Sequence, residues 1–95
     1  MKRYLVYHTL PAGLTGDQVQ EIARSTQGTP GIRGLHSYLN LTECAGVCVF
    51  EAASREPLER FFKDHNVPFD RIVPIEWEGD RGKMVEVRTL ETAGV

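Results

Sequence analysis

The sequence has few of the features that assign a function at once. It contains only two cysteines and one tryptophan among 95 residues. It also has no apolar run that approaches the roughly 20 residues of a membrane-spanning helix. The opening stretch, residues 1–8, is too short and too polar for a signal peptide. We therefore expect a cytoplasmic protein that has no membrane partner.

The sequence also lacks an excess of either charge. Eleven basic and 13 acidic residues give a formal net charge of −2, so we expect no basic surface for nucleic acid or for an anionic membrane. The composition, 41% hydrophobic and 25% charged, is that of an ordinary globular protein. A chain of this length forms one domain with a single modest core.

The two cysteines, Cys44 and Cys48, are close in sequence. On one extended strand their Cα atoms would be about 13 Å apart, which exceeds the roughly 7 Å limit for a disulfide. Only a chain that curls at Cys44 would bring the two thiols together. We expect two free thiols in a reducing compartment.

The most informative stretch, residues 34–51, has the pattern of two strands joined by a tight turn. Along both arms, leucines and valines at odd-numbered positions alternate with other residues at even-numbered positions, which is the period of a half-buried strand. We expect the odd-numbered side chains in the core. The opposite, open face of the sheet would then carry His36, Tyr38, Cys48 and Phe50.

The register of this hairpin decides which of these side chains meet. Antiparallel partners have position numbers with a constant sum, and an even sum around a tight turn near Thr42 and Glu43 would pair even-numbered with even-numbered positions. Such a turn would place His36 and Cys48 about 5 Å apart between their Cα atoms. A shift of one residue would move every one of these side chains to the other face. The predicted contact between His36 and Cys48 therefore depends on this register.

The rest of the chain alternates between strands and helices. Strands are expected over residues 3–9, 71–77 and 83–90. The first helix would start with a capping box, in which Thr15 and Gln18 each bind a first-turn amide, and the second would start at Ser54. The apolar faces of the two helices are predicted to hold Val19, Ile22, Ala23, Leu58, Phe61 and Phe62, with Thr26 at an edge.

This order of elements predicts an α+β fold, the ferredoxin-like βαββαβ sandwich, with two helices on one face of a four-stranded antiparallel sheet. Residues 1–78 would form this domain, and residues 79–95 a C-terminal hairpin or tail. The other face would be too apolar to stay in water, so we expect a homodimer joined through this open sheet face. The side chains predicted to line it or to contact a ligand there are Tyr7, Tyr38, Phe50 and Glu51.

Four segments of the chain resemble a known family, the small nickel-responsive, nickel-binding proteins of bacteria, which are ferredoxin-like dimers. In chain order these segments are Arg3-Tyr-Leu-Val6, Leu35-His-Ser-Tyr38, Cys48-Val-Phe-Glu-Ala52 and Val67-Pro-Phe-Asp-Arg-Ile72. The resemblance implies that His36 and Cys48 face a metal, with Tyr38 beside them. The resemblance implies that the bound metal is nickel or another divalent transition metal. Two positions depart from the family pattern: Tyr7 replaces an acidic residue, and Phe61 replaces a histidine.

Imidazole and thiolate form a borderline-soft ligand pair that suits nickel, zinc or copper. Two ligands are fewer than the roughly four that zinc takes, so a dimer would have to supply two more by symmetry. The competing interpretation is structural. In that case Cys48 is a small hydrophobe, and His36 forms a hydrogen bond with a neighbour.

Two other functions fit the same fold. A dimeric α+β-barrel enzyme or binding protein would hold a small aromatic ligand in an open-face cavity near His36, Tyr38 and Tyr7. A binding module without catalysis is the third possibility, and the sequence leaves open whether the protein is an enzyme. RNA recognition modules share this topology, but residues 45–50 lack the basic, glycine and aromatic run that stacks bases.

Overall fold

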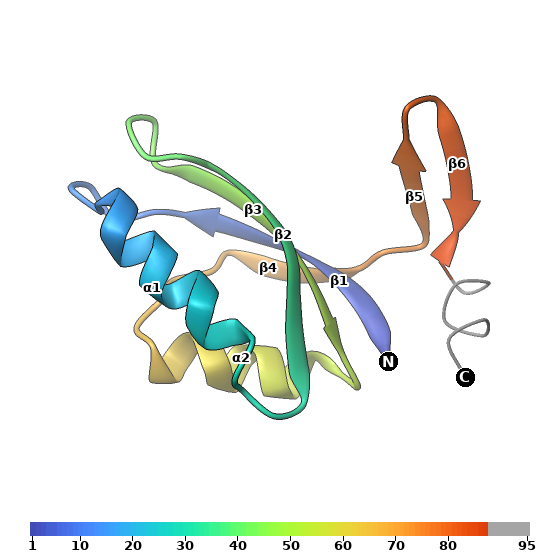
Figure 1. Ribbon diagram of the computed structural model, residues 1–95, viewed down its shortest axis with the longest axis horizontal. Coiled ribbons are helices and arrows are strands. Elements are labelled where there is room, and N and C mark those ends of the chain that lie inside the picture. Colours follow the sequence, from blue (N-terminus) through green and yellow to red (C-terminus); the bar gives the residue numbers. More distant parts are fainter. Residues whose placement is uncertain (88–95) are drawn as a thin grey trace.

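The computed structural model describes residues 1–87 (Figure 1). Its elements follow in the order β1 (Lys2–Thr9), α1 (Gly16–Thr26), β2 (Ile32–Asn40), β3 (Ala45–Ala52), α2 (Arg55–Asp64), β4 (Arg71–Pro74), β5 (Trp77–Asp80) and β6 (Lys83–Glu86). The first four strands form one antiparallel sheet in the order β2-β3-β1-β4, and β5 and β6 form a separate hairpin. The predicted ferredoxin-like α+β fold is confirmed.

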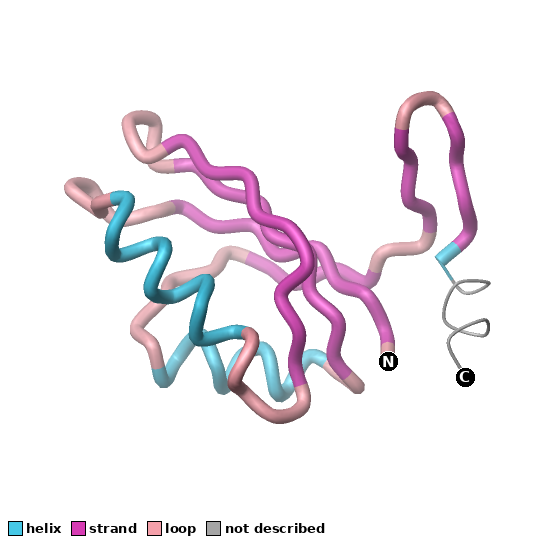
Figure 2. Tube along the Cα trace, in the orientation of Figure 1, coloured by secondary structure: helices cyan, strands magenta, loops and turns pink. Residues whose placement is uncertain are grey.

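The two helices cover one face of the four-stranded sheet, and the β5–β6 hairpin projects from the far end of the molecule (Figures 1 and 2). In residues 1–87 no helix covers the other face, which we call the open face. None of the helices in this part of the chain is long and apolar enough to span a membrane.

Both helices begin where the sequence predicts, but only the first has the predicted capping hydrogen bonds. At α1 the Thr15 hydroxyl accepts a hydrogen bond from the Gln18 amide, and the Gln18 side chain accepts one from the Thr15 amide. At α2 Ser54 is the N-cap residue, although its side chain makes no capping hydrogen bond. Asn66, just after α2, takes the left-handed conformation with a φ of 54°.

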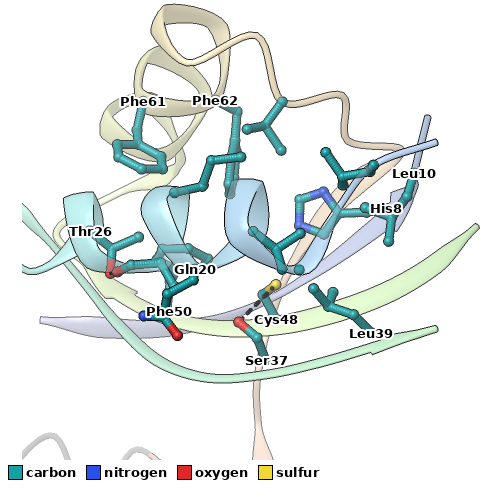
Figure 3. Close-up of a pocket in the computed structure, with 16 residues that line it drawn as sticks. His8, Leu10, Gln20, Thr26, Ser37, Leu39, Cys48, Phe50, Phe61 and Phe62 are labelled. Carbon is teal, nitrogen blue, oxygen red and sulfur yellow. Dashed lines mark hydrogen bonds between the residues drawn. The ribbon is translucent and has the colours of Figure 1, made fainter. Parts of the chain in front are cut away.

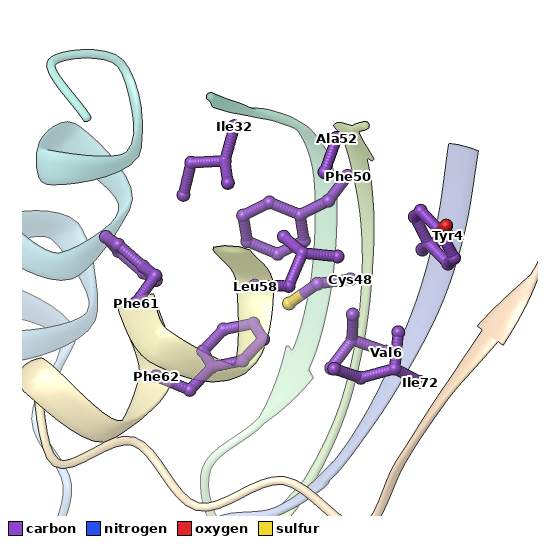
Figure 4. Close-up of a cluster of buried hydrophobic side chains, with 10 residues drawn as sticks. All are labelled: Tyr4, Val6, Ile32, Cys48, Phe50, Ala52, Leu58, Phe61, Phe62 and Ile72. Carbon is purple, nitrogen blue, oxygen red and sulfur yellow. The ribbon is translucent and has the colours of Figure 1, made fainter. Parts of the chain in front are cut away.

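The core lies between the sheet and the helices (Figure 4). Alternate residues of β1 and β3 point toward the helices, where they meet the aromatic face of α2. The rings of Phe50 and Phe62 pack edge to face with their centroids 5.4 Å apart, and Phe61 packs on Phe62 in the same way. The cluster consists of Tyr4, Val6, Ile32, Cys48, Phe50, Ala52, Leu58, Phe61, Phe62 and Ile72.

The predicted register of the β2–β3 hairpin is wrong by one residue. The connection between the strands is four residues long, 41–44, so that Asn40 pairs with Ala45. Cys44 ends this loop in the left-handed conformation, with a φ of 57°. Between the loop and the bulge, residues 36–40 pair with residues 45–49, and the numbers of each pair have an odd sum. In this part of the hairpin, even-numbered side chains of β2 share a face with odd-numbered side chains of β3.

This register moves two predicted open-face residues into the core. Cys48 and Phe50 point toward the helices and are only 8% and 4% exposed. His36 pairs instead with Val49, on the open face. A bulge at Leu35 shifts the pairing between Gly34 and His36, and both Leu35 and His36 then line the open face.

Three further expectations differ from the structure. The strand predicted over 71–77 ends at Pro74, which lacks an amide proton, and Trp77 belongs to the projecting hairpin. On α1, Val19 and Ile22 are only half-buried and Ala23 is exposed, so the predicted helix face is not fully packed. The strand predicted over 83–90 is observed as Lys83–Glu86, and its last positions lie outside the described residues.

The C-terminal end of α1 sits close to β2 because Gly34 has no side chain. A Cβ atom at this position would lie 2.6 Å from the Thr26 hydroxyl oxygen. That oxygen donates a hydrogen bond to the Ala23 carbonyl oxygen and accepts one from the Gln27 side chain, so Thr26 is held in place. Gly34 thus sets how closely the end of the helix approaches the sheet.

We predict that Gly34→Ala lowers the free energy of unfolding by about 1–3 kcal/mol, the usual cost of overpacking. The matched control is Gly28→Ala, where a new Cβ atom meets open space and the change in stability stays within about 0.5 kcal/mol or is favourable. Urea denaturation of both variants measures the difference. A Gly34→Ala protein as stable as the wild type would contradict the close approach of Thr26.

Candidate functional site

A hollow lies on each face of the four-stranded sheet. The open-face pocket, of about 630 Å³, lies between the sheet and the base of the β5–β6 hairpin. The helix-side cavity, of about 330 Å³, lies between α1 and the sheet (Figure 3). Both volumes fall within the range of small-molecule sites, roughly 300–1,000 Å³. Their linings differ in chemistry.

The open-face pocket combines aromatic rings with carboxylates. His36 and Tyr38 stack along β2 with ring centroids 6.5 Å apart and planes inclined by 15°. Trp77 lines the pocket from the hairpin, as do the acidic residues Glu78 and Asp80. Tyr38 and Trp77 remain 68% and 56% exposed. The pocket therefore offers aromatic surface, one imidazole and carboxylate oxygens.

An ion pair connects the hairpin to the body of the protein. Arg3 in β1 donates a hydrogen bond to Glu78 in β5 over 2.7 Å, and both side chains are about 30% exposed (27% and 31%). The Glu78 carboxylate is thus already neutralised by a neighbouring guanidinium. Asp80 is the other carboxylate at the pocket and is fully open to solvent on the hairpin.

The other two residues predicted for the open face do not line this pocket. Tyr7 has the same parity as Leu5 on β1 and is covered by Arg71, whose guanidinium carbon lies 4.6 Å from the centre of the ring. Glu51 is half-buried at the end of β3 and lies 3.9 Å from Arg33. The open face gathers His36 and Tyr38 at the pocket, with Tyr7 and Glu51 elsewhere on it.

Residues 1–87 of one chain do not provide a complete nickel site. Within residues 1–87, no three His, Cys, Asp or Glu side chains are grouped so that they could hold a metal ion. His36 and Cys48 point to opposite faces of the sheet, so these two residues cannot share an ion within the chain. The predicted pair is therefore corrected: His36 remains the imidazole of the open-face pocket, whereas Cys48 lines the helix-side cavity.

The helix-side cavity was not expected from the sequence. The apolar face of α1 was predicted to pack against the sheet, but its side chains there are small or medium in size. The space between helix and sheet is left partly open, with Ile22 and Phe62 among its walls. The sequence signal was the lack of a large residue on this face of α1, whereas α2 has two phenylalanines.

Two buried groups give the helix-side cavity its polarity. The Nδ1 atom of His8 lies 2.7 Å from the Pro68 carbonyl oxygen. Because a carbonyl oxygen only accepts, Nδ1 must carry the proton and donate. The Ser37 hydroxyl donates to the Cys48 sulfur over 3.2 Å. Burial raises the pKa of the Cys48 thiol, and the hydrogen bond from Ser37 opposes this more weakly. The thiol is thus neutral at neutral pH.

The raised pKa of Cys48 predicts a loss of stability at alkaline pH. In the unfolded chain the thiol ionises near the ordinary value of about 8.5, whereas in the folded protein it keeps its proton to higher pH. The unfolded state then binds fewer protons, so the free energy of unfolding falls as the pH rises above this value, by at most about 1.4 kcal/mol per pH unit. Cys48→Ala should remove this part of the slope.

The measurement is urea denaturation under reducing conditions from neutral to alkaline pH. Cys44→Ala is the matched control, because it keeps Cys48 and should keep the fall that Cys48 causes. The same pH dependence in Cys48→Ala and the wild type would show that the thiol is not desolvated in the folded protein.

The comparison with known proteins gives a family and a fold. Residues 4–75 match the protein family described as nickel responsive protein SCO4226-like. The crystal structure of SCO4226 from Streptomyces coelicolor A3(2) is similar to this structure with a TM-score of 0.70. The sequences are 15% identical, and the match covers 81% of this chain and 99% of that chain. At this identity the likeness shows a shared fold. No curated protein matches the sequence.

The family match supports the resemblance in the four sequence segments, because it extends from the first of them into the last. It also covers more than half of the chain. This protein therefore belongs to the nickel-responsive SCO4226-like family.

Proposed function

We propose that this protein is a homodimeric nickel-binding protein whose metal site is completed at the open face by a second copy of the chain. The observation that carries the proposal is the position of His36, an imidazole in a pocket that also presents Glu78 and Asp80. Membership of a nickel-responsive family favours nickel as the metal.

The second copy is inferred from the open face itself. Tyr38 and Trp77 are large side chains that are more than half exposed, and Leu5 and Val49 lie between them on the wall of the same pocket. Aromatic and apolar surface of this kind typically marks a protein interface. A two-fold dimer uses the same patch on both subunits, so it would cover this face in each copy.

The dimer would also supply the metal-binding side chains that one copy lacks at the pocket. One chain brings one imidazole to the open-face pocket, which is too few donors for tight binding. Two-fold symmetry brings a second His36 and a second set of carboxylates to the interface. Nitrogen and oxygen donors together suit Ni(II) or Cu(II). Asp80 is the more available carboxylate of each copy, because its contact with Arg81 is 3.9 Å long and exposed, whereas Arg3 holds Glu78 at 2.7 Å.

A second candidate function uses the same pocket without a metal. The stacked rings of His36 and Tyr38, together with Trp77, form walls suited to a small aromatic molecule. The pocket volume of about 630 Å³ favours this candidate. In that case His36 would act as a hydrogen-bonding group. The metal titration described below distinguishes the two.

We predict that Tyr38→Glu weakens the dimer at least about tenfold in Kd, because the carboxylate would be buried at the interface without a partner. The control is Lys63→Glu, on the exposed side of α2 and away from the open face. Sedimentation velocity over a concentration series measures both variants. A wild-type protein that stays monomeric at about 1 mM, the upper end of weak association, would rule out the dimer.

We predict that His36→Ala lowers the affinity for nickel at least about tenfold, as measured by calorimetric titration. His65→Ala is the matched control, because His65 lies after α2, stacks on Phe61 and is bonded to its carbonyl oxygen. Cys48→Ser should also bind nickel normally, since Cys48 faces the helices. Normal affinity in His36→Ala, or no binding in the wild type, would favour the second candidate function.

A further inference from the structure

The helix-side cavity is a hollow that is partly open to solvent, with the exposed residues Gln20 and Ser37 in its lining, and it is larger than an ordinary gap between packed side chains. Protein interiors contain few voids larger than a water molecule, and one water occupies about 30 Å³ of the liquid. At about 330 Å³, this cavity has the volume of roughly ten water molecules. It is also large enough for a small organic ligand.

The attachment of α1 to the sheet explains why the cavity forms. The C-terminal end of the helix is held against β2, where Thr26 lies over Gly34. Toward its N-terminus, Val19 and Ile22 line the cavity and are only half-buried. The sheet below them contributes apolar side chains, including Leu39 (Figure 3). Apolar surface on both sides of the cavity therefore lacks close packing partners.

Apart from the exposed Gln20, the polar groups that line the cavity in residues 1–87 leave one hydrogen-bonding atom without a protein partner, on His8. Among the described residues that line the cavity, there is no Asp, Glu, Lys or Arg. The Thr26 hydroxyl donates one hydrogen bond and accepts another within the protein. The Ser37 hydroxyl donates to the Cys48 sulfur. His8 is only 6% exposed. Its Nδ1 atom is bonded to Pro68, whereas its Nε2 atom has no partner in residues 1–87.

Figure 3 shows the imidazole of His8 projecting into the cavity from β1. Because Nδ1 carries the proton, Nε2 is a lone-pair acceptor. In residues 1–87 no fully buried side-chain nitrogen or oxygen lacks a hydrogen-bond partner, so Nε2 is reached by solvent through the cavity. A water molecule or a ligand in the cavity can therefore donate a hydrogen bond to His8.

We propose that the helix-side cavity binds a neutral small molecule with an apolar ring system and a hydroxyl group that donates a hydrogen bond to His8 Nε2. The rings of Phe61 and Phe62 at the cavity wall suit an aromatic or alicyclic body. A charged ligand is disfavoured, because no lining residue would neutralise it after burial. The site lies on the opposite face of the sheet from the proposed nickel site and does not depend on it.

The probe for the test is 1-naphthol, with 1-methylnaphthalene as the matched compound that lacks the hydroxyl group. Each is titrated into the metal-free, full-length protein, and binding is followed by two-dimensional 1H–15N NMR. We expect saturable shifts at the amides of Ile22, His8 and Cys48. We also expect tighter binding of 1-naphthol by about fivefold, the typical value of one neutral hydrogen bond.

Three variants make the test specific. His8→Phe removes the acceptor and keeps a ring, so it should abolish the preference for 1-naphthol while 1-methylnaphthalene still binds. Val19→Trp fills the cavity and should abolish binding of both compounds. Glu21→Trp adds the same ring to an exposed position of α1 outside the cavity lining, and it should bind both compounds as the wild type does.

The proposal is overturned if neither 1-naphthol nor a second neutral alcohol, 1-octanol, gives saturable shifts at the cavity residues. It is also overturned if the shifts fall on Leu5, Val49 and Trp77, which line the open-face pocket. If His8→Phe does not fold, as judged from its NMR spectrum, Val19→Trp and Glu21→Trp still decide the location of the site. Equal binding by these two variants would place the ligand outside the cavity.

Discussion

The pairing of β2 with β3 determines the chemistry of both faces of the sheet. Asn40 holds the loop between them, since its side chain accepts a hydrogen bond from the Glu43 amide and donates one to the Glu43 carboxylate. Cys44 completes the loop in the left-handed conformation. With this loop and the bulge at Leu35, each side chain of the hairpin is assigned to one face. A shift of one residue would exchange the two sets.

The result is a sheet with two unlike surfaces. The open face has an exposed imidazole, large aromatic side chains and carboxylates, which suits contact with a second chain and with a metal ion. The helix face has the aromatic core and a cavity without charged side chains. The same register that removes Cys48 from the open face also desolvates its thiol, and this raises its pKa. Thiolate chemistry is therefore unfavourable at neutral pH.

Local signals in the sequence were sufficient to predict the order of the elements and the fold. The capping box of Thr15 and Gln18 is an example, because it depends on a few neighbouring residues. The register of the hairpin was not predictable in this way. Two loops that differ in length by one residue leave the same alternating pattern in the strands, and the bulge at Leu35 has no local sequence signature.

The candidate sites too could be predicted only as far as they depend on neighbouring residues in one strand. His36 and Tyr38 were correctly grouped, because residues two apart on a strand always share a face. Their relation to Cys48 required the register of two strands, and the inference failed there. The cavity beside His8 depends on the summed volumes of side chains from several elements, which a pattern along the chain does not contain. The end of β4 at Pro74 is a local signal, because proline has no amide proton for a further hydrogen bond in the sheet.

The central claim is that nickel binds on the open face, between two copies of the chain. An anomalous difference map from crystals of the nickel-loaded protein tests it most directly, because the map places the metal independently of any variant. We expect a peak on the open face, within bonding distance of His36 from two subunits. A peak on the helix side of the sheet, beside Cys48, or a peak bonded within a single chain away from His36, would contradict it.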